Sequence, residues 1–180
     1  MDDDAVKKEQ HHIGTVMMIV MWLLLLVIVS YFFGKLLDQQ NNPNQVLTTK
    51  YIGDNLREIV LERNRQGHYV TNGSINGKEV VFMLDTGATG VAVPEHIATR
   101  LGLKKGVPVE IQTANGVARA YMSTLQRVGV GDIELEDVGA YINPNDQQDE
   151  ILLGMTFLKH IEFTQRGDTL ILRQYVPSQP

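Results

Sequence analysis

The chain has 180 residues, a formal net charge of −5 and no cysteine. This length fits one ordinary domain with additional segments. Without cysteine, the chain has no disulfide framework, thiol nucleophile or cysteine-based zinc site. A mildly acidic sequence without a basic stripe also argues against a nucleic-acid partner.

A short polar tail, residues 1–12, precedes an apolar segment. Residues 13–33 carry no charged side chain and end in the aromatic run Tyr31-Phe32-Phe33. About 20 apolar residues are needed for a helix to cross a bilayer, and aromatic side chains favour the interface. A cleaved signal peptide is the alternative, but its apolar region usually spans about 7–15 residues and ends at small residues. We therefore predict that residues 13–34 are an uncleaved single-pass anchor in membrane lipid.

The next segment, residues 35–57, is predicted to be a flexible tether. Its stretch 38–45 is polar and contains Pro43, which discourages a helix. Polar segments of this kind act as flexible stalks between an anchor and a domain.

Three strands are predicted between residues 58 and 84. Residues 58–63 have features of both a helix and a strand, and a good turn follows them. Residues 68–75 and 79–84 indicate strands, and Asn76-Gly77 between them is typical of a tight hairpin turn. We interpret the segment as a three-stranded meander that leads into Asp85.

The most informative stretch follows the last of these strands. Asp85 comes directly after apolar Leu84, at a position where water is scarce and neighbours must manage the protonation of a carboxylate. Thr86 offers a hydroxyl for hydrogen bonding. Gly87 allows close backbone approach and leaves N–H groups free to hold the carboxylate. An isolated Asp-Thr-Gly triplet is more often an ordinary turn, so the interpretation depends on its context.

A short helix and a hairpin are predicted after this motif. Pro94 suits the first position of a helix, and Gly102 ends its apolar face. Residues 107–113 and 117–125 indicate two strands. Their connection is Ala114-Asn115-Gly116, and Asn-Gly is a strong hairpin signal.

A second apolar motif, Ile151-Leu152-Leu153-Gly154, follows Asp85 by about seventy positions. A core strand that ends at a glycine would explain it equally well in isolation. Residues 163–173 indicate a closing hairpin, and residues 176–180 form a tail. Many short strands with glycine turns and one short helix predict an all-β fold, a small closed β-barrel over residues 58–175.

Taken together, these motifs resemble a known family. The stretch Leu84-Asp85-Thr86-Gly87-Ala88-Thr89 resembles the active-site loop of aspartic proteases. The spacing to Leu153-Gly154 resembles that of the single-domain, retroviral-type branch, the retropepsins. With its anchor, the chain is most similar to bacterial membrane-anchored retropepsin-like proteases.

The resemblance implies a mechanism and a homodimer. Aspartic proteolysis needs two carboxylates that share one proton, and like charges that close cannot both ionise. The chain has a single Asp-Thr-Gly triplet, so Asp85 of two copies would form the pair across a two-fold axis. Thr86 would hydrogen-bond across the axis, and Gly87 would donate its N–H to the carboxylates. The expected substrate is a protein or peptide, with no cofactor and no metal.

The resemblance also assigns the remaining site residues. The hairpin at 107–125 would be a flap that closes over the substrate. Leu153 and Gly154 would pack beside the Asp85 loop. Side chains that would line the cleft are Ala88, Thr89, Ala114, Asn115 and Gly116.

Orientation in the membrane follows from the family rather than from charge. Lysines flank both sides of the apolar segment, so the positive-inside count is close to a tie. The resemblance implies a bacterial inner-membrane protein with a cytoplasmic N-terminus and a periplasmic protease domain. Two other classes stay open: a dimeric, non-catalytic peptide-binding module, and a zinc hydrolase, against which five scattered histidines speak.

Overall fold

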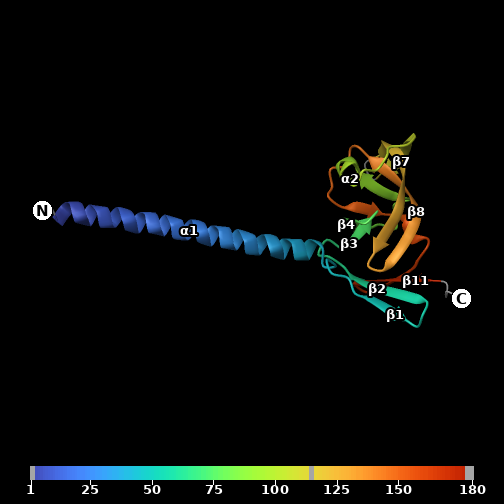
Figure 1. Ribbon diagram of the computed structural model, residues 1–180, viewed down its shortest axis with the longest axis horizontal. Coiled ribbons are helices and arrows are strands. Elements are labelled where there is room, and N and C mark those ends of the chain that lie inside the picture. Colours follow the sequence, from blue (N-terminus) through green and yellow to red (C-terminus); the bar gives the residue numbers. More distant parts are fainter. Residues whose placement is uncertain (1–2, 114–115, 177–180) are drawn as a thin grey trace. The chain divides into compact units, whose positions relative to one another are not determined.

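A computed structural model describes residues 3–113 and 116–176 (Figure 1). The chain divides into two compact units, residues Met1–Gln40 and Asn41–Pro180. The first unit consists of helix α1, Asp3–Asn41, whose last residue belongs to the second unit. The second unit contains the strands and two short helices, α2 (Glu95–Leu101) and α3 (Met155–Leu158).

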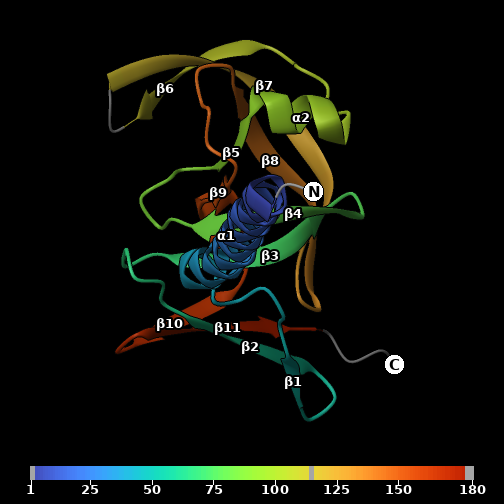
Figure 2. The ribbon, with the colours of Figure 1, turned by 90° about the vertical axis from the view of Figure 1, so that its left-hand side faces the viewer.

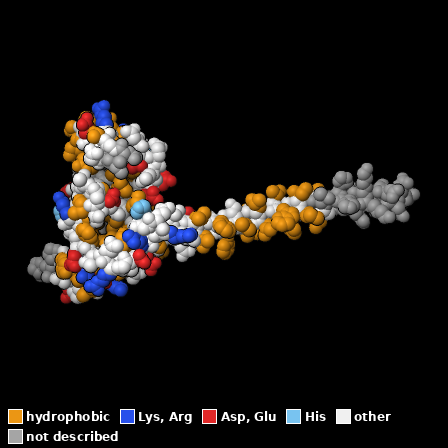
Figure 3. All heavy atoms as spheres, turned by 180° about the vertical axis from the view of Figure 1, so that it is seen from behind, with side chains coloured by type: hydrophobic (Ala, Val, Ile, Leu, Met, Phe, Trp, Pro, Cys, Tyr) orange, Lys and Arg blue, Asp and Glu red, His pale blue; other side chains and the backbone are white. Residues whose placement is uncertain are grey.

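Between Val16 and Phe33, helix α1 is apolar on all sides. Its large hydrophobic side chains between Val16 and Leu37 are all exposed, and Figure 3 shows them along the helix. The stretch Val16–Asn41 is long and apolar enough to cross a membrane, and an 18-residue window within it has a mean hydropathy of 2.7. A helix that is hydrophobic all round needs an apolar environment. The predicted apolar helix at residues 13–34 is therefore present, although α1 continues beyond it.

Four antiparallel strands form the smaller sheet of the folded unit. They come from the two ends of that unit, in the order β1-β2-β11-β10 (Figure 2). Their bounds are Thr49–Ile52 for β1, Leu56–Glu62 for β2, Glu162–Arg166 for β10 and Thr169–Tyr175 for β11. Strand β2 pairs with β11 from Leu56↔Tyr175 to Glu62↔Thr169, so the first and last parts of the unit are joined.

Seven strands form the larger sheet, in the order β3-β4-β9-β5-β8-β7-β6. Their bounds are Tyr69–Ile75 for β3, Lys78–Leu84 for β4, Val91–Pro94 for β5, Pro108–Thr113 for β6, Gly116–Val130 for β7, Ile133–Asn143 for β8 and Ile151–Leu153 for β9. Strand β3 also pairs with β7 at Ser74↔Gly129 and Ile75↔Val128, so the row of strands curls back on itself.

One hydrophobic core joins the two sheets. Ile59 and Leu61 of the smaller sheet cluster with Phe82, Leu125 and Leu153 of the larger one, and all five side chains are fully buried. The predicted all-β class is confirmed. The predicted closure of the barrel depends on the two residue pairs between β3 and β7, so we describe a curled sheet packed on a smaller one.

The local signals at two turns were correct. Asn76 and Gly77 connect β3 to β4 with φ angles of 51° and 77°, the left-handed conformation that Asn-Gly favours. Gly102 ends α2 with φ 76°, and its N–H bonds to Ala98 and Thr99 carbonyls.

The segment predicted as a flexible tether, residues 35–57, is structured. The helix α1 continues to Asn41, strand β1 follows, and β2 begins at Leu56. Buried asparagines hold the intervening chain, because the Asn44 side chain donates to the carbonyls of Glu62 and Val70 and accepts from the Glu62 N–H. These partners lie far along the sequence, so a local composition signal did not reveal them. The predicted three-stranded meander is only partly correct. Strands β3 and β4 pair as expected, but β2 pairs with β1 and β11 instead of β3.

Candidate active site

Asp85 lies at the point where β4 and β9 run side by side. The two strands are parallel, with Leu84 beside Leu153, and the Asp85 N–H donates to the Leu153 carbonyl at 3.2 Å. The side chain of Asp85 is half-buried. Parallel pairing places the ends of both apolar motifs together, so Leu153-Gly154 lies next to the Asp85 loop.

The loop after Asp85 folds back on the carboxylate. The Gly87 N–H donates to Asp85 Oδ1 at 2.8 Å, and the Ala88 N–H donates to the Asp85 carbonyl at 3.3 Å. The first of these bonds is the contact expected of Gly87. A backbone N–H that donates to a carboxylate oxygen fixes the orientation of the side chain.

Only glycine fits at position 154, because the backbone of the Asp85 loop lies directly against it. A Cβ atom at this position would lie 2.3 Å from the Gly90 carbonyl oxygen and 2.6 Å from that of Ala88. The adjacent Met155 N–H donates to the Ala88 carbonyl at 2.9 Å. The two motifs therefore meet backbone to backbone, which holds the Asp85 loop rigidly against the start of α3.

Thr156 is a further support that the sequence analysis missed. Its hydroxyl accepts a hydrogen bond from the Val91 N–H at 3.0 Å and donates to the Gly139 carbonyl at 2.8 Å. One side chain of α3 thus connects β5 with β8. A threonine in a short helix gives no local signal of this role, because both partners are distant in sequence.

A pocket of about 280 Å³ adjoins Asp85. Asp85 and Thr86 are among the polar residues that line it. The other lining residues are Tyr69, Leu84, Leu158, Phe163, Gln165 and Leu170. None of these six side chains was among the predicted site residues. Leu84 belongs to the strand that leads into Asp85, and the others come from β3, α3, β10 and β11. The Tyr69 side chain is buried, and its hydroxyl has no hydrogen-bond partner among the described residues.

The remaining predicted site residues lie on two segments. Thr86, Gly87 and Thr89 are exposed on the Asp85 loop, whereas Ala88 is half-buried. The predicted flap corresponds to the β6–β7 hairpin, in which Thr113 pairs with Gly116. The predicted cleft residues Ala114 and Asn115 lie outside the described residues.

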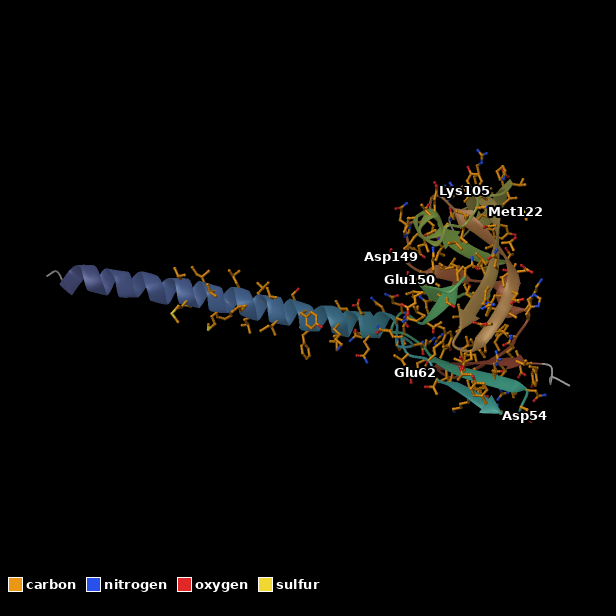
Figure 4. The ribbon with its side chains drawn as sticks, in the orientation of Figure 1. Asp54, Glu62, Lys105, Met122, Asp149 and Glu150 are labelled. Carbon is orange, nitrogen blue, oxygen red and sulfur yellow. The ribbon has the colours of Figure 1, made fainter. Side chains whose placement is uncertain are left out.

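The base of this hairpin is fixed at Met122. The Gly106 N–H donates to the Met122 carbonyl at 2.8 Å, and the Met122 N–H donates to the Val107 carbonyl at 2.9 Å. In Figure 4, Met122 marks this part of β7, and Lys105 marks the segment that leads into β6. From this base toward the turn of the hairpin, β6 pairs only with β7 among the described strands.

Other carboxylates lie apart from this arrangement. Asp149 and Glu150, labelled in Figure 4, lie on the loop before β9, where Asp149 approaches His96 at 3.5 Å. Within the described part of the chain, no group of three His, Asp or Glu side chains is placed to hold a metal ion.

Comparison with known proteins relates this geometry to a family. A family model described as gag-polyprotein putative aspartyl protease matches residues 71–160, which include both motifs. The crystal structure of a retropepsin-like aspartic protease from Rickettsia conorii is similar, with a TM-score of 0.55 and 31% sequence identity. The match covers 73% of this chain and 97% of that one.

Two longer bacterial proteins are related in sequence. An uncharacterized protein in the cobV 5′ region of a Sinorhizobium species is 36% identical over 121 residues, 65% of this chain and 52% of that protein. The uncharacterized protein RP867 of Rickettsia prowazekii is 32% identical over 119 residues, 64% of this chain and 51% of that protein. The chain spans about half the length of these relatives. From the family model and the matched structure, the chain belongs to the retropepsin-like aspartic proteases.

Proposed function

We propose that this chain is a membrane-tethered aspartic endopeptidase whose active site forms when two copies bring their Asp85 side chains together. The observation that carries the proposal is the Asp85 loop. A half-buried carboxylate is held by the Gly87 N–H at 2.8 Å and opens into a pocket. The chain has one Asp-Thr-Gly triplet, so the second carboxylate comes from a second copy.

In this proposal the two carboxylates share a single proton. The ionised carboxylate takes a proton from a water molecule as the water oxygen bonds to the carbonyl carbon of the peptide. The protonated carboxyl gives its proton to the carbonyl oxygen, which forms a tetrahedral diol. One carboxyl then protonates the amide nitrogen as the C–N bond breaks, while the other accepts a proton from a diol hydroxyl. The pair again holds one proton, and general acid–base catalysis of this kind contributes about 10²–10⁴-fold.

The surrounding residues have supporting roles in this scheme. Thr86 hydrogen-bonds across the two-fold axis, and Gly87 keeps Asp85 oriented. Leu153 and Gly154 fix the loop from behind. The β6–β7 hairpin acts as the flap, with Ala114, Asn115 and Gly116 at its tip, and Ala88 and Thr89 line the cleft. An extended peptide would bind through its backbone, with side chains in mostly apolar pockets.

Helix α1 supplies the membrane anchor in this proposal. Its apolar stretch is long enough to cross a bilayer, and the related proteins are bacterial. We place the N-terminus in the cytoplasm and the folded unit in the periplasm, at the inner membrane. Two copies confined to one membrane have a raised effective concentration, which favours dimerisation.

The decisive experiment compares single aspartate variants of the full chain in detergent micelles. A diverse peptide mixture is incubated with wild-type protein, Asp85→Asn and the control Asp168→Asn, and products are identified by mass spectrometry. Asp168 is an exposed turn residue that pairs with Arg63. We expect Asp85→Asn to lower cleavage by about 10²–10⁴-fold and the control to match wild type. Cleavage that persists in Asp85→Asn excludes the proposed mechanism.

A mixing experiment tests the shared dyad. If each active site needs Asp85 from both copies, equal amounts of wild-type and Asp85→Asn protein, after subunit exchange, should show about half of the activity of the wild-type protein alone. An unchanged activity after exchange means that each copy works independently. A folded dimer without cleavage at any pH would favour the peptide-binding module.

A further inference from the structure

A further pocket of the folded unit lies between α2 and the strands β3 and β4. Its volume is about 330 Å³. Side chains that can carry positive charge reach it from α2, where His96 and Arg100 are one helical turn apart. Carboxylates reach it from two other segments, with Glu79 on β4 and Asp149 on the loop before β9. The pocket therefore offers charges of both signs within one small volume.

The charges of this pocket are incompletely paired. Within the described part of the chain, neither the Arg100 guanidinium nor the Glu79 carboxylate forms an ion pair. His96 approaches Asp149 at 3.5 Å, but the side chains are 48% and 99% exposed. Such an exposed pair is held only weakly. A ligand with one anionic and one cationic group would find a partner for each.

The pocket adjoins the residues at which the chain leaves α1. Asn72 of β3 lines the pocket, accepts a hydrogen bond from the Asn42 side chain at 2.8 Å and donates to the Gln45 carbonyl at 3.0 Å. Asn42 directly follows the last residue of α1. Figure 4 shows Asp149 on the same side of the folded unit as the first residues of that unit. The pocket is thus close to the attachment point of the helix.

Only a short length of helix separates this point from the apolar stretch. Residues 13–33 carry no charged side chain. Residues 34–41 add eight residues of α1, which span at most about 12 Å at 1.5 Å per residue. The headgroup layer on each side of a bilayer is about 5–8 Å thick. If α1 crosses a membrane as proposed, Asn42 and the pocket beside Asn72 lie within reach of lipid headgroups.

The charges of the pocket select among headgroups. Phosphoethanolamine carries an anionic phosphate and a primary ammonium, which match a guanidinium and a carboxylate. The quaternary ammonium of choline is recognised by aromatic faces. No Phe, Tyr or Trp among the described residues lines this pocket. A headgroup with negative charge alone would meet repulsion from Glu79 and Asp149. The zwitterionic headgroup with N–H donors fits best.

We propose that this pocket binds the phosphoethanolamine headgroup of a membrane lipid, with the phosphate at Arg100 and His96 and the ammonium at Glu79 and Asp149. The inference rests on the membrane anchor of the proposed function, but not on the chemistry of Asp85. The bound lipid gives the folded unit a second attachment to the bilayer besides α1. It contacts β4, the strand that leads to Asp85, and so keeps the candidate active site close to the membrane surface.

Lipid competition on the full chain tests the pocket. The protein in detergent micelles is mixed with equal amounts of phosphatidylethanolamine and phosphatidylcholine with the same acyl chains, and bound lipids are counted by native mass spectrometry. We expect wild-type protein to prefer phosphatidylethanolamine about tenfold. The double variant Glu79→Gln plus Arg100→Gln replaces two exposed side chains and preserves net charge, and it should bind both lipids equally.

A matched control carries the same changes outside the pocket. Glu110 and Arg119 are an exposed pair of opposite charges on the β6–β7 hairpin. Glu110→Gln plus Arg119→Gln should keep the wild-type lipid preference. A preference lost in both double variants would be an unspecific effect of charge and would overturn the proposal.

A titration with the free headgroup identifies the source of the ligand. Soluble O-phosphoethanolamine has the same charged groups without acyl chains. A lipid in the same micelle or membrane as α1 has a raised effective concentration. We therefore expect the soluble compound to displace bound phosphatidylethanolamine only in about 10²-fold excess or more. Displacement at equal concentration would assign the pocket to a soluble ligand and overturn the lipid assignment.

The outcomes separate this inference from the proposed function. Equal binding of the two lipids by wild-type protein, or a preference that survives in the pocket variant, overturns the headgroup site even if Asp85-dependent cleavage is found. A preference lost only in the pocket variant supports the site, whether or not peptides are cleaved. Extraction of the full chain from membranes by alkaline carbonate would reject the anchor itself.

Discussion

The Asp85 loop and the β6–β7 hairpin both belong to the seven-stranded sheet, but different contacts hold them in place. The loop is hydrogen-bonded to Leu153 of β9 and Met155 of α3, and Gly154 packs against its backbone. The outer hairpin is held by its own ladder, and a Cβ at Gly116 would meet open space. Tertiary contacts thus fix the loop that carries the carboxylate, whereas the pairing between β6 and β7 holds the described part of the hairpin beyond Met122.

The largest effect should come from Gly154→Ala. The added Cβ would lie 2.3 Å from the Gly90 carbonyl oxygen, and neither backbone can withdraw without breaking the loop. We expect the free energy of unfolding to fall by about 3 kcal/mol. Urea unfolding followed by near-ultraviolet circular dichroism measures it. Gly139→Ala is the control, because its Cβ makes an ordinary contact at 3.9 Å. Equal stability of both variants would contradict the rigid contact.

Thr156→Val should have an intermediate effect. The substitution keeps the shape but removes the hydroxyl that bridges the Val91 N–H and the Gly139 carbonyl. An unpaired buried N–H should lower stability by about 1–3 kcal/mol. The control Thr99→Val removes an exposed helix hydroxyl and should change stability by about 0.5 kcal/mol or less. Hydrogen exchange at Val91 localises the effect; unchanged protection there would rule out the bridge.

Gly116→Ala makes the same chemical change as Gly154→Ala, but in the hairpin. Gly116 has φ 106°, which alanine adopts only with strain, although space for its methyl group is open. We expect a stability loss of about 1 kcal/mol confined to the hairpin, with a change in both KM and kcat for peptide cleavage. If Gly116→Ala lowers the free energy of global unfolding as much as Gly154→Ala does, the hairpin does not unfold independently of the rest of the unit.

The smallest effect should come from Tyr51→Phe, which is remote from both segments. The Tyr51 hydroxyl donates to Asp132 at 2.6 Å, and this bond raises the pKa of Tyr51 above its ordinary value of about 10. The stabilisation is therefore complete below pH 10 and is lost as the pH rises through the raised pKa. Urea midpoints of the wild-type protein should exceed those of Tyr51→Phe at pH 8, and the difference should vanish at higher pH. A difference that persists there contradicts the assignment.

Sequence reasoning succeeded where short-range chemistry determines the structure. The Asn76-Gly77 turn, the end of α2 at Gly102 and the pairing of the two apolar motifs each depend on a local backbone preference or a family spacing. The Gly87 N–H contact to Asp85 has the same origin, because it joins residues two positions apart.

The errors involve partners that are far apart in sequence. Asn44 reads as a loop residue, yet its side chain joins Glu62 and Val70 as an additional strand would. The pairing of β2 with β11 spans nearly the whole folded unit, and neither strand carries a signal that names the other. The pocket residues Tyr69 and Phe163 were missed for the same reason, since only the completed fold brings them to Asp85.

The pairing of β2 with β11 also sets an order of events during synthesis. Strand β2 leaves the ribosome early, but its partner β11 is the last of the described strands, and β4 must likewise wait for β9. Contacts between such distant segments form slowly. The apolar helix is complete long before either sheet can close. In the proposed role of α1, delivery to a membrane can therefore begin before the unit of residues 41–180 has folded, and the proposed active site can form only after β9 and β11 have been synthesised.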